Sequence, residues 1–371
     1  MEKMKKLIWI IVAIAIIAGA VFLFGRGNGD ISNSEPIKIG VLLCLTGDCA
    51  EWGENSLNGL KLASEEINNN GGVLGRPVEL VIQDSAEDNP ADSVSAYRQL
   101  VLQKVKYIIG PNWTKAGLSI APIAAKDNVI ITSPSLGVAG FNEESENIFN
   151  IWPHDDIATR ALARFAIEKG LKKAAIFSSK EFWYQTQGNA FEDEFTKLGG
   201  VITAKEEPLL TQRDIKTEAI KIKNSNPDVV MYSNFDNMGI MAKELKVFGY
   251  TGKQISILMD ESRILQAQGA FEGVIYAQYA KPSEEFINKY KIKFGKEPGI
   301  TADTAYDTLR IYAKIISDTG TDDIDAAQKT YAKLKTYSGA SGELTFDGKG
   351  GVTKPSVFWT VKDGNSILYN E

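Results

Sequence analysis

Histidine and cysteine are scarce in this sequence, and their scarcity excludes several kinds of chemistry. The 371 residues include one His and two Cys. Transition-metal sites draw most of their ligands from these two residue types, and a catalytic triad uses a His as its base. The sequence also shows no serine-elbow motif and no phosphate-binding loop motif. We therefore expect no metal site, no cofactor and no catalytic activity.

An excess of positive charge is also lacking. The 41 Lys and Arg residues are outnumbered by 47 Asp and Glu, which gives a formal net charge of −6. This balance argues against a nucleic-acid-binding surface. Hydrophobic residues make up 44% of the chain and charged residues 24%, as in a globular protein with a full core. The length is sufficient for two domains.

One long hydrophobic run stands near the N-terminus. Residues 7–24 are eighteen uncharged residues, near the length that crosses a bilayer, and Lys3, Lys5 and Lys6 precede them. We expect residues 1–30 to form an uncleaved transmembrane anchor and tether, with the rest of the chain on the extracytoplasmic face. The alternative is a signal peptide cleaved after Ala18–Ala20, which would leave a secreted or periplasmic protein.

The two cysteines, Cys44 and Cys49, lie in the segment "LLCLTGDCAEWG". Outside the cytoplasm, a pair of cysteines usually oxidises. A disulfide across this short loop is therefore one interpretation. The other interpretation is two small core residues with no bond between them, because sequence alone does not supply their separation.

Strand and helix patterns alternate twice along the chain. Each half begins with an apolar strand and a helix that ends in a double glycine, and the second double glycine follows the first by 128 residues. This alternation predicts an α/β fold of two doubly wound, Rossmann-like lobes with parallel sheets. The last third of the chain crosses between the lobes, which predicts a hinge and a ligand cleft. The expected boundaries are 36–154 with 283–345 for lobe 1, and 155–282 with 346–371 for lobe 2.

The loops after the strands are the expected ligand site, because open parallel sheets bind ligands at the carboxyl ends of their strands. In the loop "GPNWTKAG" a helix begins at about Thr114. Its free backbone N–H groups and the Thr114 hydroxyl suit an anionic or polar group, and Trp113 supplies an apolar wall. The alternative is that Thr114 only caps the helix.

Several motifs resemble those of type 1 periplasmic solute-binding proteins, nearest to the leucine/isoleucine/valine-binding receptors of ABC importers. They occur in the family's order and are "IKIGVLLCLTGDCAEWGENSLNGLKLASEEINNNGGVLGRPVELVIQD", "YIIGPNWT", "IITSPS", "AFEDEFTKLGGVI" and "PDVVMYSN". The resemblance implies a monomeric receptor that closes on a branched-chain or aromatic amino acid, or on a related amide. It implies delivery of that solute to permease and ATPase subunits. The alternative is a sensing receptor that reports to a membrane signalling partner.

The resemblance also implies a set of ligand-binding residues. Thr114 stands where the family holds the ligand carboxylate, and the Ser135 carbonyl where it meets the ammonium. Gly137 replaces a family Thr and loses its hydroxyl. Asp260, with Glu261 as the alternative, is the expected acidic partner, and Tyr184 is the alternative to Trp183 among the aromatic residues. The full expected set is Trp52, Trp113, Thr114, Ser135, Gly137, Trp183, Phe235 and Asp260.

The unbroken apolar run predicts that the N-terminal segment stays attached. Membrane fractions of expressing cells should contain full-length protein, because no signal peptidase removes the anchor. N-terminal sequencing checks this, and the peptide that includes Lys3–Lys6 should be recovered. A mature N-terminus near Val21 would contradict the uncleaved anchor.

Overall fold

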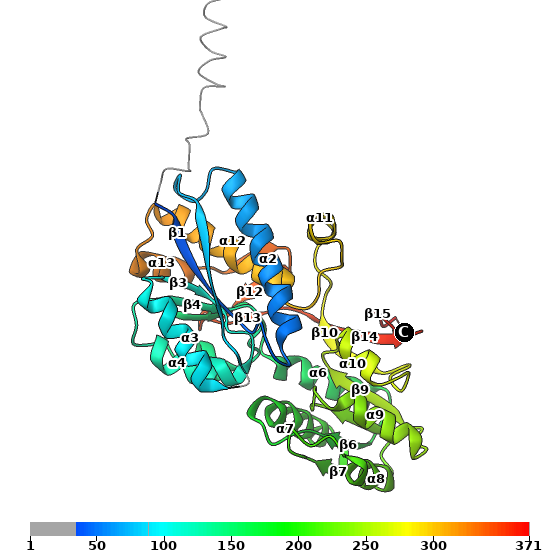
Figure 1. Cartoon of the computed structure of the whole chain (residues 1–371). Coiled ribbons are helices and arrows are strands. Elements are labelled where there is room, and N and C mark those ends of the chain that lie inside the picture. The colour runs from blue at the N-terminus through cyan, green and yellow to red at the C-terminus, as the bar shows by residue number, and fades with distance from the viewer. Residues whose placement is uncertain (1–34, 88, 371) are drawn as a thin grey trace, which may run out of the picture.

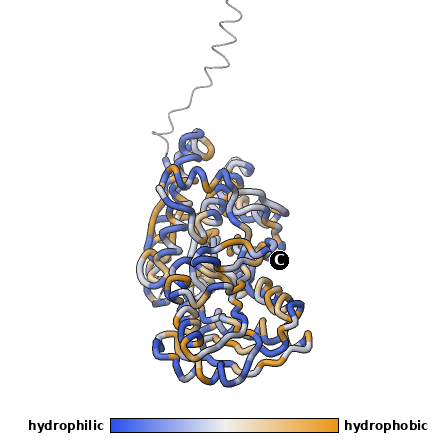
Figure 2. The backbone as a smooth tube through the Cα atoms, turned by 90° about the vertical axis from the view of Figure 1, so that its right-hand side faces the viewer, coloured by the Kyte–Doolittle hydropathy of each residue, from blue (hydrophilic) through white to orange (hydrophobic). Residues whose placement is uncertain are grey.

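A computed structural model describes residues 35–87 and 89–370 as two stacked lobes, with the lobe that contains β1 above the lobe that contains β6 in Figure 1. The predicted anchor lies outside these described residues. Within them, no helix is both long enough and apolar enough to cross a bilayer. Apolar segments are distributed through both lobes, as Figure 2 shows, which agrees with a separate core in each lobe.

Lobe 1 is built on a five-stranded parallel sheet with the strand order β2-β1-β3-β4-β5. Its central strands are buried on both faces, which explains their unbroken apolar sequence. The strands are β1 (Ile37–Leu43), β2 (Val78–Asp84), β3 (Tyr107–Ile109), β4 (Ile130–Ser133) and β5 (Ile148–Asn150).

Helices cover both faces of this sheet and create two cores. Ile39 and Val41 of β1 pack on the side of α2 and α12, which lie side by side, whereas Leu42 packs on the side of α3 and α4. The helices are α2 (Ala50–Asn69), α3 (Pro90–Leu102), α4 (Thr114–Ala124), α5 (Ala139–Asn142), α11 (Glu284–Phe294), α12 (Ala302–Thr319) and α13 (Ile324–Tyr331). A small antiparallel sheet completes the lobe with β11 (Thr336–Gly339), β12 (Gly342–Phe346) and β13 (Val352–Thr353).

Lobe 2 contains a seven-stranded sheet with the order β15-β14-β10-β9-β8-β6-β7. Strands β6 to β10 are parallel, and β14 joins β10 in the antiparallel sense. The strands are β6 (Lys173–Phe177), β7 (Val201–Glu206), β8 (Val229–Tyr232), β9 (Lys253–Ile257), β10 (Ile275–Tyr279), β14 (Ser356–Lys362) and β15 (Asn365–Leu368). The helices are α6 (Asp155–Glu168), α7 (Phe182–Lys197), α8 (Lys216–Asn224), α9 (Met238–Val247) and α10 (Glu261–Gln266).

The chain crosses between the lobes three times, after β5, after β10 and after β13. The third crossing lies after β13, and not after residue 345 as expected. Strand β13 pairs with β12, and Val352 is buried in the lobe 1 core, so lobe 1 extends past that boundary. A two-residue strand carries no readable periodicity, which is why the sequence did not reveal it. Three crossings of this kind form a hinge about which the lobes can close.

Cys44 and Cys49 form a disulfide in the loop between β1 and α2, with their Cα atoms 5.8 Å apart. This separation lies within the usual range for a disulfide. Cys49 is the residue that precedes α2, and Trp52 lies in the first turn of that helix. The bond therefore restrains the segment that brings Trp52 toward lobe 2.

Replacing both cysteines by Ala should lower the free energy of unfolding by about 2 kcal/mol, because the unfolded chain regains the freedom of a short loop. Chemical denaturation of the full-length protein, with and without a reducing agent, measures this. The reducing agent should destabilise the wild type and leave the double variant unchanged. A wild type that does not respond to reduction would contradict the prediction.

Candidate functional site

A cavity of about 550 Å³ lies between the lobes, among the loops that follow the strands. Every residue of the expected ligand-binding set lines it except Asp260. Their contacts with a ligand stay a prediction. The lining residues are Asp48, Trp52, Glu87, Asn112, Trp113, Thr114, Lys115, Leu118, Ser135, Gly137, Asp155, Glu181, Phe182, Trp183, Tyr184, Leu210, Thr211, Arg213, Phe235, Asp236 and Leu258.

Aromatic side chains from both lobes form the apolar walls of the cavity. Trp52 of α2 lies edge-on to Phe235 of lobe 2, with ring centroids 6.0 Å apart. Trp183 and Tyr184, at the start of α7, form a second edge-on contact at 5.3 Å. Such contacts hold large rings in fixed orientations and leave their remaining surface for an apolar ligand body.

The backbone segment immediately before α4 binds an acidic side chain of the protein itself. The buried carboxylate of Glu87 accepts hydrogen bonds from the backbone N–H groups of Asn112, at 2.8 Å, and of Trp113. The Ser85 hydroxyl donates a third bond at 2.7 Å. Because these backbone donors lead directly into α4, the negative charge sits at the positive end of the helix dipole.

Thr114 is the first residue of α4, and the position that precedes the helix belongs to Trp113. Among the described residues, the Thr114 hydroxyl has no hydrogen-bond partner, and it faces the cavity. The helix-capping interpretation therefore does not describe this side chain. Its hydroxyl can donate and accept, so it is available to a polar ligand group.

Asp155 fills the space that Gly137 leaves open. The carboxylate accepts hydrogen bonds from the indole N–H groups of Trp152 and Trp183, both at 2.8 Å. A Cβ atom added to Gly137 would lie 1.9 Å from Oδ2 of Asp155. Any side chain at position 137 would therefore displace this carboxylate. At the position where the resemblance implied a lost hydroxyl, the structure places the Asp155 carboxylate.

Asp260 does not line the cavity and belongs to an ion-pair network. Its carboxylate lies 3.1 Å from the guanidinium of Arg263, which also lies 2.9 Å from Asp236. Tyr184 donates to Asp236 at 2.7 Å, and Arg263 stacks over the ring of Phe235. The bond from Asp260 to a ligand ammonium stays a prediction. To form it, the ammonium would compete with Arg263 for the Asp260 carboxylate.

Burial perturbs the two acids that line the inner part of the cavity. Desolvation raises the pKa of Glu87 to about 7. The hydrogen bonds to its carboxylate favour the ionised form and oppose this increase, but they do not cancel it. Desolvation raises the pKa of Asp155 to about 7 as well, and the nearby charge of Asp156 adds to the increase. Within the described part of the chain, neither carboxyl has an ion-pair partner.

Comparison with known proteins agrees with this geometry. A family model described as periplasmic binding protein matches residues 36–365. The chain belongs to the periplasmic binding protein family. Members of this family bind solutes outside the cytoplasm, and the family thus accounts for the two lobes and the cavity between them.

Individual relatives are distant but span most of the chain. The Leu/Ile/Val-binding protein homolog 3 of Brucella melitensis is 25% identical over 86% of this chain and 89% of the relative. The match to the Leu/Ile/Val-binding protein BraC3 of Rhizobium johnstonii, also 25% identical, covers 56% of this chain and 58% of that protein. The structure of a leucine binding protein from Thermotoga maritima superposes with a TM-score of 0.84 at 24% identity, over 90% of this chain and 98% of that protein.

Sequence reasoning missed Glu87 and Asp155 as residues of this periplasmic binding protein site. Glu87 follows strand β2, and the rule that ligands bind at the carboxyl ends of strands would have included its loop. Asp155 begins α6 at the first crossing between the lobes, outside the strand-end loops in which a ligand site was expected. Only the folded chain shows that Gly137 makes room for it.

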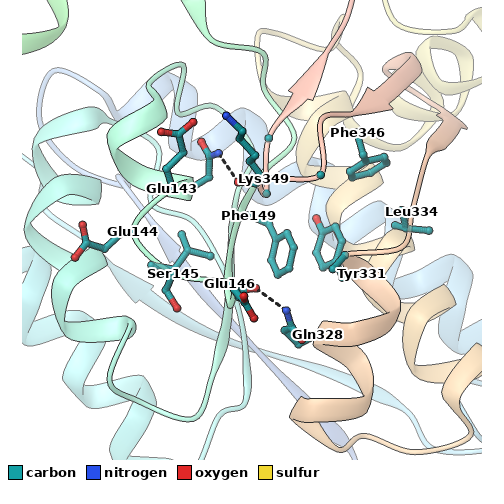
Figure 3. Close-up of a pocket in the computed structure, with 16 residues that line it drawn as sticks. Glu143, Glu144, Ser145, Glu146, Phe149, Gln328, Tyr331, Leu334, Phe346 and Lys349 are labelled. Atoms are coloured by element: carbon teal, nitrogen blue, oxygen red, sulfur yellow. Dashed lines mark hydrogen bonds between the residues drawn. The ribbon is translucent and has the colours of Figure 1, made fainter.

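A second cavity, of about 630 Å³, lies on lobe 1 alone. Figure 3 shows Glu143, Glu144 and Ser145 on one side of it, and Tyr331, Leu334 and Phe346 on the other. The acidic residues precede β5, so this cavity lies at the amino end of that strand. A periplasmic binding protein binds its solute at the opposite ends of the strands, between two lobes. This second cavity is therefore not the candidate site.

The raised pKa values predict how stability depends on pH. Between about pH 4.5 and about pH 7, folded Glu87 holds a proton that the unfolded chain has lost, so the free energy of unfolding falls as pH rises. Over this pH range, the free energy of unfolding of Glu87→Gln should fall by roughly 2 to 3 kcal/mol less than that of the wild type. Denaturation of the full-length protein across this range measures it, with Glu79→Gln on the exposed side of β2 as the control. Equal slopes for wild type and Glu87→Gln would contradict the prediction.

Proposed function

We propose that this chain is the solute receptor of an ABC importer, and that its solute is a branched-chain or aromatic amino acid, or an amide or amine related to one. The observation that carries the proposal is the cavity shared by the two lobes, with its aromatic walls and few polar groups. Its volume of about 550 Å³ suits a small solute. The names of the Leu/Ile/Val-binding relatives support the same class of solute.

Closure of the lobes explains how such a receptor works. Contacts across the cleft include the bond from the Ser262 hydroxyl to Glu51, at 2.7 Å, and the packing of Trp52 against Phe235. A solute that touches both walls binds the closed form more tightly than the open form, and so shifts the population toward it. A permease that recognises the closed form would then receive loaded receptors selectively.

The second candidate function is a sensing receptor, because the same closure could report the solute to a membrane signalling partner. We favour import, since a solved structure of similar fold, from Streptococcus pneumoniae, is described as a branched-chain amino acid transporter substrate binding protein. Both functions place a monomer at the extracytoplasmic face, held by the N-terminal segment. Co-purification with permease and ATPase subunits would support import, and co-purification with a kinase in their place would support sensing.

The direct test identifies the solute. Full-length protein purified from its native membrane under mild conditions should carry a small molecule that mass spectrometry can detect. A thermal-shift screen with branched-chain and aromatic amino acids, their amides and their amines should then raise the melting temperature with at least one compound. A response only to sugars or dicarboxylates would show that the proposed class of solute is wrong.

Thr114→Ala should weaken solute binding by about tenfold, because it removes a cavity-facing hydroxyl that is not used within the protein. Calorimetric titration with the compound found in the screen measures the affinity. Thr114→Ser keeps the hydroxyl and should bind like the wild type. Unchanged affinity in Thr114→Ala, together with a lower melting temperature, would show that Thr114 serves the fold and not the solute.

A further inference from the structure

The first turns of α2 in lobe 1 and of α10 in lobe 2 meet outside the solute cavity. The hydroxyl of Ser262 donates a hydrogen bond to the Glu51 carboxylate at 2.7 Å. In Figure 1 the lower end of α2 lies toward α10, and this end carries the contact. Glu51, Asp260 and Ser262 do not line the cavity, so contacts among them join the lobes without involving the solute site.

Trp52, in the first turn of α2, is a second point of contact between the lobes. Its ring packs edge-on against Phe235 of lobe 2, with centroids 6.0 Å apart. Its indole nitrogen is buried, and no described residue accepts a hydrogen bond from its N–H group. A buried N–H group without a partner is costly, so an acceptor that it reaches on closure stabilises the closed form.

The Asp260 carboxylate is an acceptor close to this N–H group. Burial raises the pKa of Asp260, and the positive charge of Arg263 opposes the increase. The negative charge of Glu51 raises the same pKa further, whereas the nearby indole N–H of Trp52 lowers it, because a donor favours the ionised form. Two residues of lobe 1 therefore act on one carboxylate of lobe 2.

Each half of this contact is held within its own lobe. In lobe 1, the Thr301 hydroxyl donates to the Trp52 carbonyl at 3.0 Å, and Cys49 of the disulfide directly precedes α2. In lobe 2, Asp260 accepts from the backbone N–H of Arg263 at 2.9 Å, and the guanidinium of Arg263 lies 3.1 Å from the same carboxylate. Groups that are already fixed lose little freedom when the lobes meet, so their bonds favour closure more strongly.

We propose that four residues, two from each lobe, form a clasp that stabilises the closed form of the receptor. In this clasp the Ser262 hydroxyl donates to Glu51, and a small further approach of the lobes lets the Trp52 indole donate to Asp260. Asp260 thus serves closure, in place of the contact with a solute ammonium that the resemblance implied. The inference rests on the proposed receptor function, because it concerns lobes that close on a solute.

A clasp outside the cavity changes the affinity for solutes without changing the selectivity among them. The apparent affinity of each solute falls with the population of the form that binds it. Weakening the clasp lowers the population of the closed form, and so weakens the binding of every solute by the same factor. A side chain that contacts the solute behaves differently, because its removal affects only solutes that carry the matching group. The two roles of Asp260 are therefore separable by experiment.

The first experiment is calorimetric titration of the full-length protein with matched compounds. The pairs are phenylalanine with hydrocinnamate and leucine with isocaproate, so the members of each pair differ only by the ammonium group. Asp260→Asn should weaken both members of a pair by the same factor, about tenfold, because one carboxylate oxygen becomes a donor. Asp323→Asn is the matched control, because Asp323 caps α13 of lobe 1 by accepting from the backbone N–H of Ala326 at 3.0 Å.

The second experiment needs no added compound. Single-molecule fluorescence energy transfer between dyes at Gln103→Cys of lobe 1 and Lys197→Cys of lobe 2 measures the closed population of the full-length protein. The wild type should show such a population, and Ser262→Ala and Asp260→Asn should each lower it by about threefold or more. Ser225→Ala is the control, because the Ser225 hydroxyl donates within lobe 2, at 2.8 Å to the carbonyl of Ile222. Near-ultraviolet circular dichroism verifies that each variant is folded.

The outcomes are distinct. If Asp260→Asn weakens only the amino acids and spares the acids without an ammonium, Asp260 binds the solute, and the clasp is wrong while the receptor function stands. A wild type without a closed population, or closed populations that are equal in the wild type and both variants, would also overturn the clasp. If none of the four compounds binds the wild type, the proposed class of solute is wrong, and the closed populations alone decide on the clasp.

Discussion

The side chain of Asn112 holds the lobe 1 wall of the cleft together. Its carbonyl oxygen accepts from the backbone N–H of Cys44, and its amide donates to the hydroxyls of Ser56 and Ser135. Its backbone N–H donates to Glu87. One buried amide therefore connects the ends of β1, β2, β3 and β4 and the start of α2. The cleft owes its shape on this side to a network in which a single lost partner would leave several buried polar groups unpaired.

The acidic residues around the cleft differ in whether a cation pairs with them. In lobe 2, Arg263 lies between Asp236 and Asp260 and stacks on Phe235, so the charges there are balanced before any solute arrives. Glu87 of lobe 1 and Asp155 at the start of α6 have neutral donors only. Neutral donors orient a carboxyl group and partly offset its desolvation, but burial still raises the pKa of both groups to about 7.

The sequence predicted the architecture because its signals are local. Apolar runs, helical spacing and double glycines predicted the strands and helices of both lobes, and the carboxyl-end rule predicted the loops that meet in the cleft. The aromatic residues that the resemblance implied line the cavity, and their contacts with a solute stay a prediction. The resemblance did not reveal the acids, because their effect depends on contacts between distant segments. The contact of Asp155 with Gly137 and that of Glu87 with Asn112 each join loops that no periodicity connects.

Family membership explains where a solute binds, and individual side chains decide which solute it is. Gly137 illustrates the difference, since the absence of a side chain there makes room for the Asp155 carboxylate. Closure then amplifies the consequence. A solute that touches both walls of the cleft lowers the free energy of the closed form more than that of the open form. The side chains that select the solute therefore also decide how strongly its binding favours closure.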